Sequence, residues 1–243
     1  MCFQISQSQA IKELNKKYAA KSSKELASKI DQPNFHLNGF NHPKALIITS
    51  ANNDYSISES RWGIAPENTI DIDKYYSNAH SFGGGLNSKS EVLFSHFLYK
   101  EIIYQQRCLI PVSGFIEPYK FNGKSYPYYI KHKKNLSISL AGLYTQFQNF
   151  TTFSIITKTA SPFFAEIHNV KKRQPVILNR NNIKHWLNPK SNVDDIKNCI
   201  NSHFDETQLD HYPINNVVYK RGIDSNTPDV LKPYFYQELQ TLF

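Results

Sequence analysis

The chain has 243 residues, enough for one sizeable core and near the upper limit for a single α/β or β domain. Hydrophobic residues make up 40% and charged residues 20%, which excludes an intrinsically disordered chain. The net charge of +8 favours phosphate backbones or anionic surfaces as partners, and no apolar run approaches the roughly 20 residues of a membrane span.

The first predicted elements are a short helix and two strands. Ser22 and Glu25 resemble a capping box, which predicts a helix that runs through Ile30. Residues 45–49 are continuously apolar or β-branched and predict a buried strand. A second strand is expected from Glu59 to Ala65, ending at a proline.

A glycine-rich loop follows at Ser81–Asn87. It lacks the Lys-Ser/Thr pair of a P-loop and the spacing of a dinucleotide-binding fingerprint, so we interpret it as a turn. Ser90 is placed to cap a helix, with an apolar face that extends to Leu98.

The second half of the chain predicts a succession of strands separated by turn signals such as Asn122-Gly123. The expected strands are 107–112, 114–119, 125–130, 136–144, 152–157 and 175–178, with short helices at 182–187 and 193–202. We therefore predict an α+β fold: one domain over residues 1–243, built on a curved mixed or antiparallel β-sheet or an open barrel with peripheral helices.

Metal and cofactor sites are not expected. The nine histidines and three cysteines form neither a C-x-x-C nor an H-E-x-x-H motif. Cys2, Cys108 and Cys199 are too few and too widely spaced for a disulfide framework, which suits a reducing cytoplasm. We predict a cytoplasmic monomer that uses no cofactor and has no membrane partner.

Cys2 draws attention because of its position. Aminopeptidases remove Met1 when a small residue follows, and the product is a 1,2-aminothiol. An α-amine with a pKa of roughly 7.7–8.0 is partly neutral near pH 7 and condenses with an aldehyde to an imine. The neighbouring thiol can then close a thiazolidine ring, helped by its high effective concentration. By position alone, an incidental small hydrophobic residue is the favoured interpretation of Cys2.

Several short motifs follow Cys2 in a fixed order. They are Arg61-Trp-Gly63, Asn87-Ser-Lys-Ser-Glu91, the segment Arg107–Glu117, Ala141-Gly-Leu-Tyr144, Thr157-Lys-Thr-Ala160, Ile167-His168 and Arg173-Gln-Pro-Val-Ile-Leu178. Together with Cys2 they resemble the SRAP family, the SOS response-associated peptidase-like proteins that protect abasic sites in single-stranded DNA. The resemblance covers about residues 2–187, and we expect residues 188–243 to pack on that part.

The resemblance implies four catalytic residues. Cys2 would be the nucleophile that forms a thiazolidine with the aldehyde of the ring-opened sugar. Asn87 would help hold Cys2 and the sugar, Glu117 would transfer protons, and His168 would assist the imine chemistry. It also implies four DNA contacts, Arg61, Trp62, Lys89 and Arg173, in a protein that associates with the nucleoid when bound to DNA.

The residue types also suit these roles on chemical grounds, independently of the resemblance to the family. Imine formation needs a proton donor for the departing water and a base that frees the amine, and a carboxyl with an imidazole supplies both. Phe115 and Ile116 suggest an apolar wall that raises the pKa of Glu117. Each residue also has an ordinary alternative: Glu117 could pair with a lysine, and His168 could be a satisfied core imidazole.

The remaining site residues have similar alternatives. Asn87 could be a turn residue and Trp62 ordinary core, while Arg61, Lys89 and Arg173 could be solvated charges.

Four features depart from the family pattern. Lys89 stands in place of the usual Arg and loses bidentate geometry. Pro118 replaces a Trp, and Gln174 replaces a Met. Residues 169–172 lengthen the spacing between His168 and Arg173, so Lys171 or Lys172 could take the phosphate contact of Arg173.

The sequence therefore predicts covalent capture of abasic sites in single-stranded DNA, with lyase-type or reversal chemistry. Two alternatives remain. One is an N-terminal cysteine peptidase or amidohydrolase, whose activity could be limited to removing its own Met1. The other is a non-catalytic single-stranded DNA-binding module that uses basic and aromatic residues.

Overall fold

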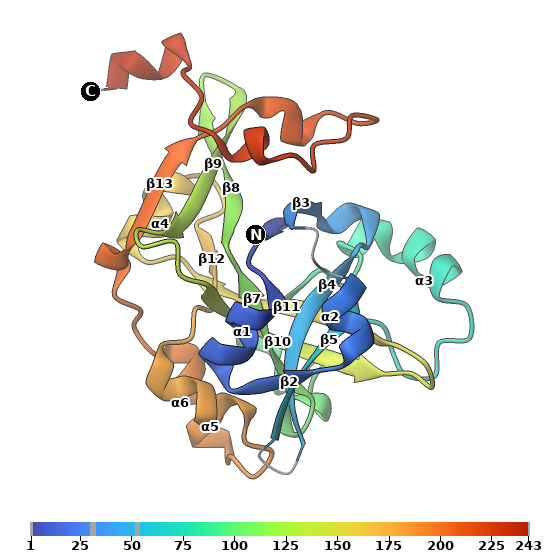
Figure 1. The fold of residues 1–243 in the computed structure, drawn as a ribbon. Coiled ribbons are helices and arrows are strands. Elements are labelled where there is room, and N and C mark those ends of the chain that lie inside the picture. Colours follow the sequence, from blue (N-terminus) through green and yellow to red (C-terminus); the bar gives the residue numbers. More distant parts are fainter. Residues whose placement is uncertain (1, 30–32, 52–53, 243) are drawn as a thin grey trace.

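The computed structural model describes residues 2–29, 33–51 and 54–242 (Figure 1). Its strands are β1 (Gln4–Gln7), β2 (Ala20–Ser22), β3 (Asn34–Asn38), β4 (Lys44–Ala51), β5 (Asp54–Trp62), β6 (Asn87–Lys89), β7 (Arg107–Val112), β8 (Gly114–Phe121), β9 (Lys124–His132), β10 (Ile138–Gln146), β11 (Thr151–Thr159), β12 (Arg173–Pro175) and β13 (Leu209–Pro213). Its α-helices are α1 (Ile11–Tyr18), α2 (Lys24–Lys29), α3 (Ile72–Ala79), α4 (Pro162–Ile167), α5 (Arg180–Leu187) and α6 (Val193–Asn201).

The strands form two sheets. The smaller one has the order β13-β9-β8-β1-β3, so that β1 at the start of the chain lies inside the sheet, antiparallel to both of its neighbours. The larger sheet has the order β12-β11-β10-β7-β4-β5-β2, and β6 pairs with β11. This sheet curves strongly enough for β5 to pair in parallel with β11 as well.

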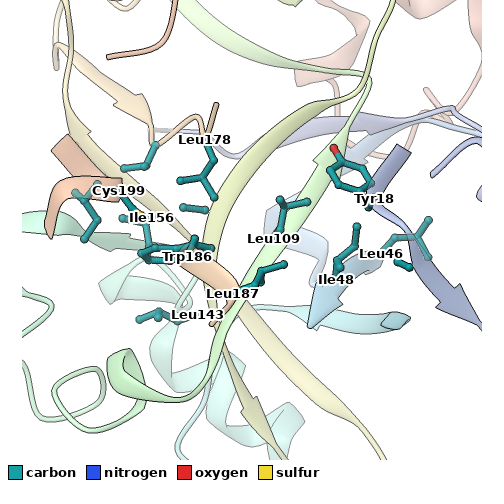
Figure 2. Close-up of a cluster of buried hydrophobic side chains, with 14 of the residues drawn as sticks. Tyr18, Leu46, Ile48, Leu109, Leu143, Ile156, Leu178, Trp186, Leu187 and Cys199 are labelled. Carbon is teal, nitrogen blue, oxygen red and sulfur yellow. The ribbon is translucent and has the colours of Figure 1, made fainter. Parts of the chain in front are cut away.

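The larger sheet is buried on both faces, which explains the continuously apolar runs of its central strands. Alternate residues of one strand point to opposite faces. In β4, Ile48 enters a cluster covered by α1, α5 and α6, whereas Ile47 enters a second cluster that faces the smaller sheet. Figure 2 shows the first cluster, in which Leu109 and Ile156 from the sheet lie with Trp186 from α5.

The second cluster carries the site, because it fills the space between the two sheets. Cys2, Ile5 and Phe115 belong to the smaller-sheet side of it, and Ile110 and Ile155 come from the larger sheet. All five are fully buried. The N-terminal residues are thus held inside the molecule by packing on both sides.

A third, smaller cluster ties the C-terminal segment to the smaller sheet. Val218 and Val230 pack against Ile116 of β8. The side-chain oxygen of Asn226 also accepts hydrogen bonds from the backbone amides of Phe35 and His36 at the start of β3, at 2.7 and 3.2 Å.

The structure confirms the α+β fold class on curved sheets and the succession of strands after residue 107. Asn122 and Gly123 have φ values of 47° and 77° and join β8 to β9 in a two-residue turn, as predicted. The predicted helix near residue 22 is present as α2, but Ser23 caps it by accepting a bond from the Leu26 amide at 3.0 Å. Its expected end at Ile30 lies outside the described residues.

Three predictions of local structure differ from the structure: one expected helix is absent, and two expected strands have other bounds. The helix expected from Ser90 to Leu98 is a 3₁₀ turn at Ser90–Val92 followed by further turns. Leu93 is fully buried and Phe97 is 75% exposed, so the apolar residues do not share the single face that a helix would give them. The strand expected at Glu59–Ala65 begins earlier and ends at Trp62, because Gly63 takes a φ of 125°.

The third difference concerns residues 175–178. The strand there, β12, begins at Arg173 and ends at Pro175, and only Ile177 continues as an isolated bridge to Leu140. Within the described part of the chain, no helix is both long and apolar enough to cross a membrane.

Candidate functional site

Cys2 lies just before β1, with its side chain fully buried between the two sheets. Its Sγ donates a weak hydrogen bond to the Gln4 carbonyl at 3.9 Å. Burial raises the pKa of the Cys2 thiol well above its usual value, and the negative charge of Glu117 raises it further. The thiol therefore needs a base before it can act as a nucleophile.

Glu117 is carried by β8, the strand next to β1. Gln4 pairs with Ile116, so the register brings Glu117 level with the residues that precede β1. The Glu117 side chain is fully buried, and burial raises the pKa of its carboxyl to about 7. The predicted rise is confirmed, and both forms of the carboxyl are present near neutral pH.

His168 directly follows the helix α4, and its imidazole lies beside the carboxyl of Glu117. Its Nδ1 lies 3.4 Å from Oε2 of Glu117 and 3.0 Å from the carbonyl oxygen of Arg173. Burial lowers the pKa of His168 to about 4, which leaves the ring neutral at physiological pH. The structure thus brings together three of the four predicted catalytic residues.

Asn87 is the first residue of β6, which pairs in parallel with β11. Its register partner Ile155 belongs to the cluster around Cys2, whereas the next pair, Ser88 and Ile156, faces the other way. The Asn87 amide therefore points to the side of the sheet where Cys2 lies. Both of its polar side-chain atoms are buried without a hydrogen-bond partner among the residues described, an arrangement that suits a ligand contact.

A cavity of about 520 Å³ also borders Asn87. It lies beside α3 and the turns after β6, and aromatic rings supply much of its lining, including Tyr75, Phe97 and Tyr99.

The predicted DNA-contacting residues differ from one another in their exposure and in their partners. Arg61 forms an ion pair with Asp73 at 2.7 Å and lies over the ring of Tyr76, with its guanidinium carbon 4.7 Å from the ring centroid. Its side chain is 31% exposed. Lys89 is exposed at the end of β6, and Lys171 and Lys172 are exposed on the segment before β12.

Trp62 is placed in the core and not on a DNA-binding surface. Its indole is fully buried, donates a hydrogen bond to the Leu86 carbonyl at 2.9 Å and stacks on Phe153. This burial favours the core alternative over a base-stacking role, because no face of the ring is presented to solvent.

Arg173 is held by partners that the sequence analysis did not assign. Its guanidinium forms two bonds with the Glu91 carboxylate, at 2.5 and 3.0 Å, and one with the Thr157 carbonyl at 2.8 Å. Glu91 and Thr157 both belong to the short motifs of the sequence, but spacing alone gave them no role. Within the described ranges, no group of three or more His, Cys, Asp or Glu side chains is arranged to hold a metal ion.

Comparison with known proteins identifies the family of this chain. The family model described as "SOS response associated peptidase (SRAP)" matches residues 1–221. The "Abasic site processing protein YoqW" of Bacillus subtilis (strain 168) is 27% identical over 219 residues, covering 84% of this chain and 92% of that protein. YoaM of the same organism, which carries the same description, is 26% identical over 193 residues and covers 77% and 80%.

Two solved structures show the same fold. A protein from Bacteroides thetaiotaomicron superimposes with a TM-score of 0.83 at 27% identity, over 96% of this chain and all of that one. A protein from Bordetella bronchiseptica gives a TM-score of 0.69 at 18% identity, over 88% of this chain and all of that one. The chain belongs to the SRAP family.

Proposed function

We propose that this protein captures abasic sites in single-stranded DNA through the amine and thiol of Cys2, after Met1 has been removed. The carrying observation is the meeting of the Glu117 carboxyl and the His168 imidazole beside Cys2 in one buried place. The names of its relatives, which describe abasic site processing, support the class of substrate. Met1 itself lies outside the described residues.

The first step of the proposed reaction joins the amine to the sugar. The neutral α-amine of Cys2 attacks the aldehyde carbon of the ring-opened abasic sugar and gives a carbinolamine. The acid form of Glu117 donates a proton to the hydroxyl, which leaves as water, and a protonated imine remains beside the Glu117 carboxylate. A carboxyl with a pKa of about 7 suits this role, because an appreciable fraction still carries its proton at neutral pH.

The second step closes the ring. The carboxylate left on Glu117 takes the thiol proton, and the sulfur adds to the imine carbon. The nitrogen keeps the proton of the protonated imine and Glu117 is again in its acid form, so that aldehyde and aminothiol have become a thiazolidine and one water. Closure is intramolecular and gains from a high effective concentration. Neutral His168 lies beside Glu117, with its Nδ1 3.4 Å from the carboxyl, and the Asn87 amide would bind a sugar oxygen.

Exposed lysines are the strongest candidates for phosphate contacts. Lys89, Lys171 and Lys172 are open to solvent, and the chain carries a net charge of +8. Arg61 could contribute once its ion pair with Asp73 is exchanged for a phosphate.

The experiment is a denaturing gel. Protein whose intact mass shows loss of Met1 is incubated with single-stranded DNA that carries one abasic site. We expect a shifted band that survives denaturation and is absent for Cys2→Ala. Cys199→Ala is the matched control, because Cys199 is a buried cysteine of the other cluster and should leave the band unchanged.

Three outcomes separate the candidate functions. Equal bands from the wild type and Cys2→Ala would refute capture by Cys2. Turnover of a peptide or amide without DNA would favour an N-terminal cysteine hydrolase. Binding that is fully reversed by salt and unaffected by Cys2→Ala would indicate a non-catalytic DNA-binding module. Cys2→Ser should form at most a reversible imine or oxazolidine.

A further inference from the structure

The hydrogen bonds of His168 define which ring nitrogen carries the proton. Nδ1 lies 3.0 Å from the Arg173 carbonyl oxygen, and a carbonyl oxygen can only accept. Nδ1 must therefore be the protonated nitrogen of the neutral ring, which leaves the lone pair on Nε2. A neutral imidazole with the opposite tautomer would set a lone pair against the carbonyl oxygen.

The same proton also constrains Glu117. Its Oε2 lies 3.4 Å from Nδ1 of His168 and faces an N–H group. An O–H on Oε2 has no acceptor in that N–H group, so this tautomer favours the acid proton of Glu117 on Oε1. The tautomer of one imidazole thus influences which oxygen of the carboxyl donates a proton.

The Arg173 carbonyl is held in place by its own side chain as well as by β12. Arg173 pairs with Thr159 in the sheet, and its guanidinium bonds Glu91 through two nitrogens and Thr157 through its carbonyl and hydroxyl oxygens. Its side chain is 14% exposed. A two-nitrogen bond to a carboxylate fixes the orientation of the guanidinium plane as well as its position.

We propose that Glu91 and Arg173 are positioning residues that fix the tautomer of His168: the ion pair anchors Arg173, and its carbonyl keeps the proton on Nδ1. This inference rests on the proposed function for its catalytic meaning, but the tautomer exists without DNA. A phosphate could reach the Arg173 guanidinium only by displacing Glu91, whereas Lys171 and Lys172 are exposed on the adjoining segment. The proposal therefore assigns Arg173 to the protein interior and leaves phosphate contact to the lysines.

The direct test is nitrogen NMR of the histidine rings in the full chain at pH 7.5. Two-bond ¹⁵N–¹H correlations distinguish an Nδ1–H ring from an Nε2–H ring, and His168→Gln identifies the signals of His168. We expect the Nδ1–H pattern in the wild type and an increased fraction of Nε2–H in Glu91→Ala and Arg173→Ala. Glu238→Ala is the matched control, because Glu238 forms an exposed ion pair with Lys124 away from the site.

The second readout separates positioning from DNA binding. Glu91→Ala removes a negative charge, so electrostatics alone predicts equal or tighter binding to single-stranded DNA. We expect capture of the abasic site to be slower nevertheless, on the order of 10-fold, because the proton-transfer groups are misplaced. Arg173→Lys keeps the charge and loses the bidentate geometry, and should also slow capture.

An Nε2–H ring in the wild type, or an unchanged tautomer in both alanine variants, would overturn the proposal. Faster capture by Glu91→Ala would also overturn it and would mean that Glu91 only competes with phosphate for Arg173. Loss of capture in every protein, with the tautomer shift as expected, would refute the proposed function and leave the positioning role intact. Thermal unfolding of each variant shows whether it is folded.

Discussion

Nδ1 of His168 lies 3.4 Å from Oε2 of Glu117, and the two side chains are 4% and 0% exposed. Burial shifts both pKa values toward the neutral forms, to about 4 for His168 and about 7 for Glu117. Between these values both side chains are neutral and do not form an ion pair. Above pH 7 a carboxylate lies beside a neutral ring, which makes Glu117 the group that titrates near physiological pH.

The raised pKa of Glu117 predicts a pH-dependent stability. The unfolded chain ionises Glu117 near its ordinary pKa of 4.5 and the folded chain near 7, so its contribution to the free energy of unfolding falls between these pH values. Glu117→Gln does not lose stability in this way, because a glutamine side chain does not ionise. Relative to the wild type it should gain stability from pH 4.5 to pH 7, by about 3 kcal/mol in total, and nothing further above that.

The measurement is urea unfolding of both proteins from pH 4 to pH 8.5. His168 gives the opposite trend in both proteins, because its depressed pKa makes folding more favourable as pH rises from about 4 to 6.5. The difference between variant and wild type therefore isolates Glu117. A difference that does not change with pH would mean that the Glu117 pKa is not raised.

Removal of exposed lysines should weaken DNA binding without changing the chemistry. Lys171→Ala and Lys172→Ala should each lower the slope of log affinity against log salt by about 0.7 if the residue contacts a phosphate of single-stranded DNA. The rate of capture at saturating DNA should stay unchanged. Titrations at several salt concentrations test this, with Lys184→Ala on α5 as an exposed control. Unchanged slopes for both variants would contradict the assignment of phosphate contact to this segment.

Arg107 is a buried cation that holds the end of α5. Its guanidinium donates to the carbonyls of Trp186 at 2.6 Å, Ile103 at 2.5 Å and Asn188. Arg107→Met would leave these carbonyls without their donor, and we expect a loss of about 3 kcal/mol of unfolding free energy. Lys184→Met, an exposed change on the same helix, should cost less than about 0.5 kcal/mol. Equal effects in chemical denaturation would refute this role.

The glycine-rich loop offers a matched pair of substitutions. Gly83 and Gly85 both have positive φ, at 87° and 68°. A Cβ on Gly85 would lie 2.3 Å from the Ile64 carbonyl oxygen, whereas a Cβ on Gly83 would meet nothing within 4 Å. Gly83→Ala should cost about 1 kcal/mol from backbone strain alone. Gly85→Ala should cost at least about 2 kcal/mol more, because backbone atoms must move. Similar melting temperatures for the two variants would count against the close approach.

Much of the sheet was predictable because its signals are local. The apolar runs of β7, β10 and β11 and the Asn122-Gly123 turn each lie within a few residues. The strand β1 gave no such signal, since Gln4, Ser6 and Gln7 are polar and yet buried. Gln7 is satisfied by the carbonyls of Leu46 and Pro111, which are distant in the sequence and meet only in the fold.

The candidate site likewise has a part that could be predicted from the sequence and a part that could not. Cys2, Asn87, Glu117 and His168 were assigned by resemblance to a family, and their residue types suit the chemistry. Their mutual geometry depends on pairing among strands from separate parts of the chain. The bond between Glu91 and Arg173 could not be predicted, because either side chain reads as an ordinary surface charge until β6 and β12 are placed beside β11.

The position of β1 inside its sheet determines when, during translation, the N-terminal segment becomes enclosed. Gln4 pairs with Ile116, which the ribosome adds on the order of ten seconds later at about 5–20 residues per second. Pairing with β3 can occur earlier, but an isolated two-stranded unit is only marginally stable in water. An aminopeptidase therefore has its best access to Met1 while β8 is still being made. Once β8 docks, Cys2 is enclosed between the sheets. Removal of Met1, which exposes the α-amine of Cys2, is therefore best completed during translation.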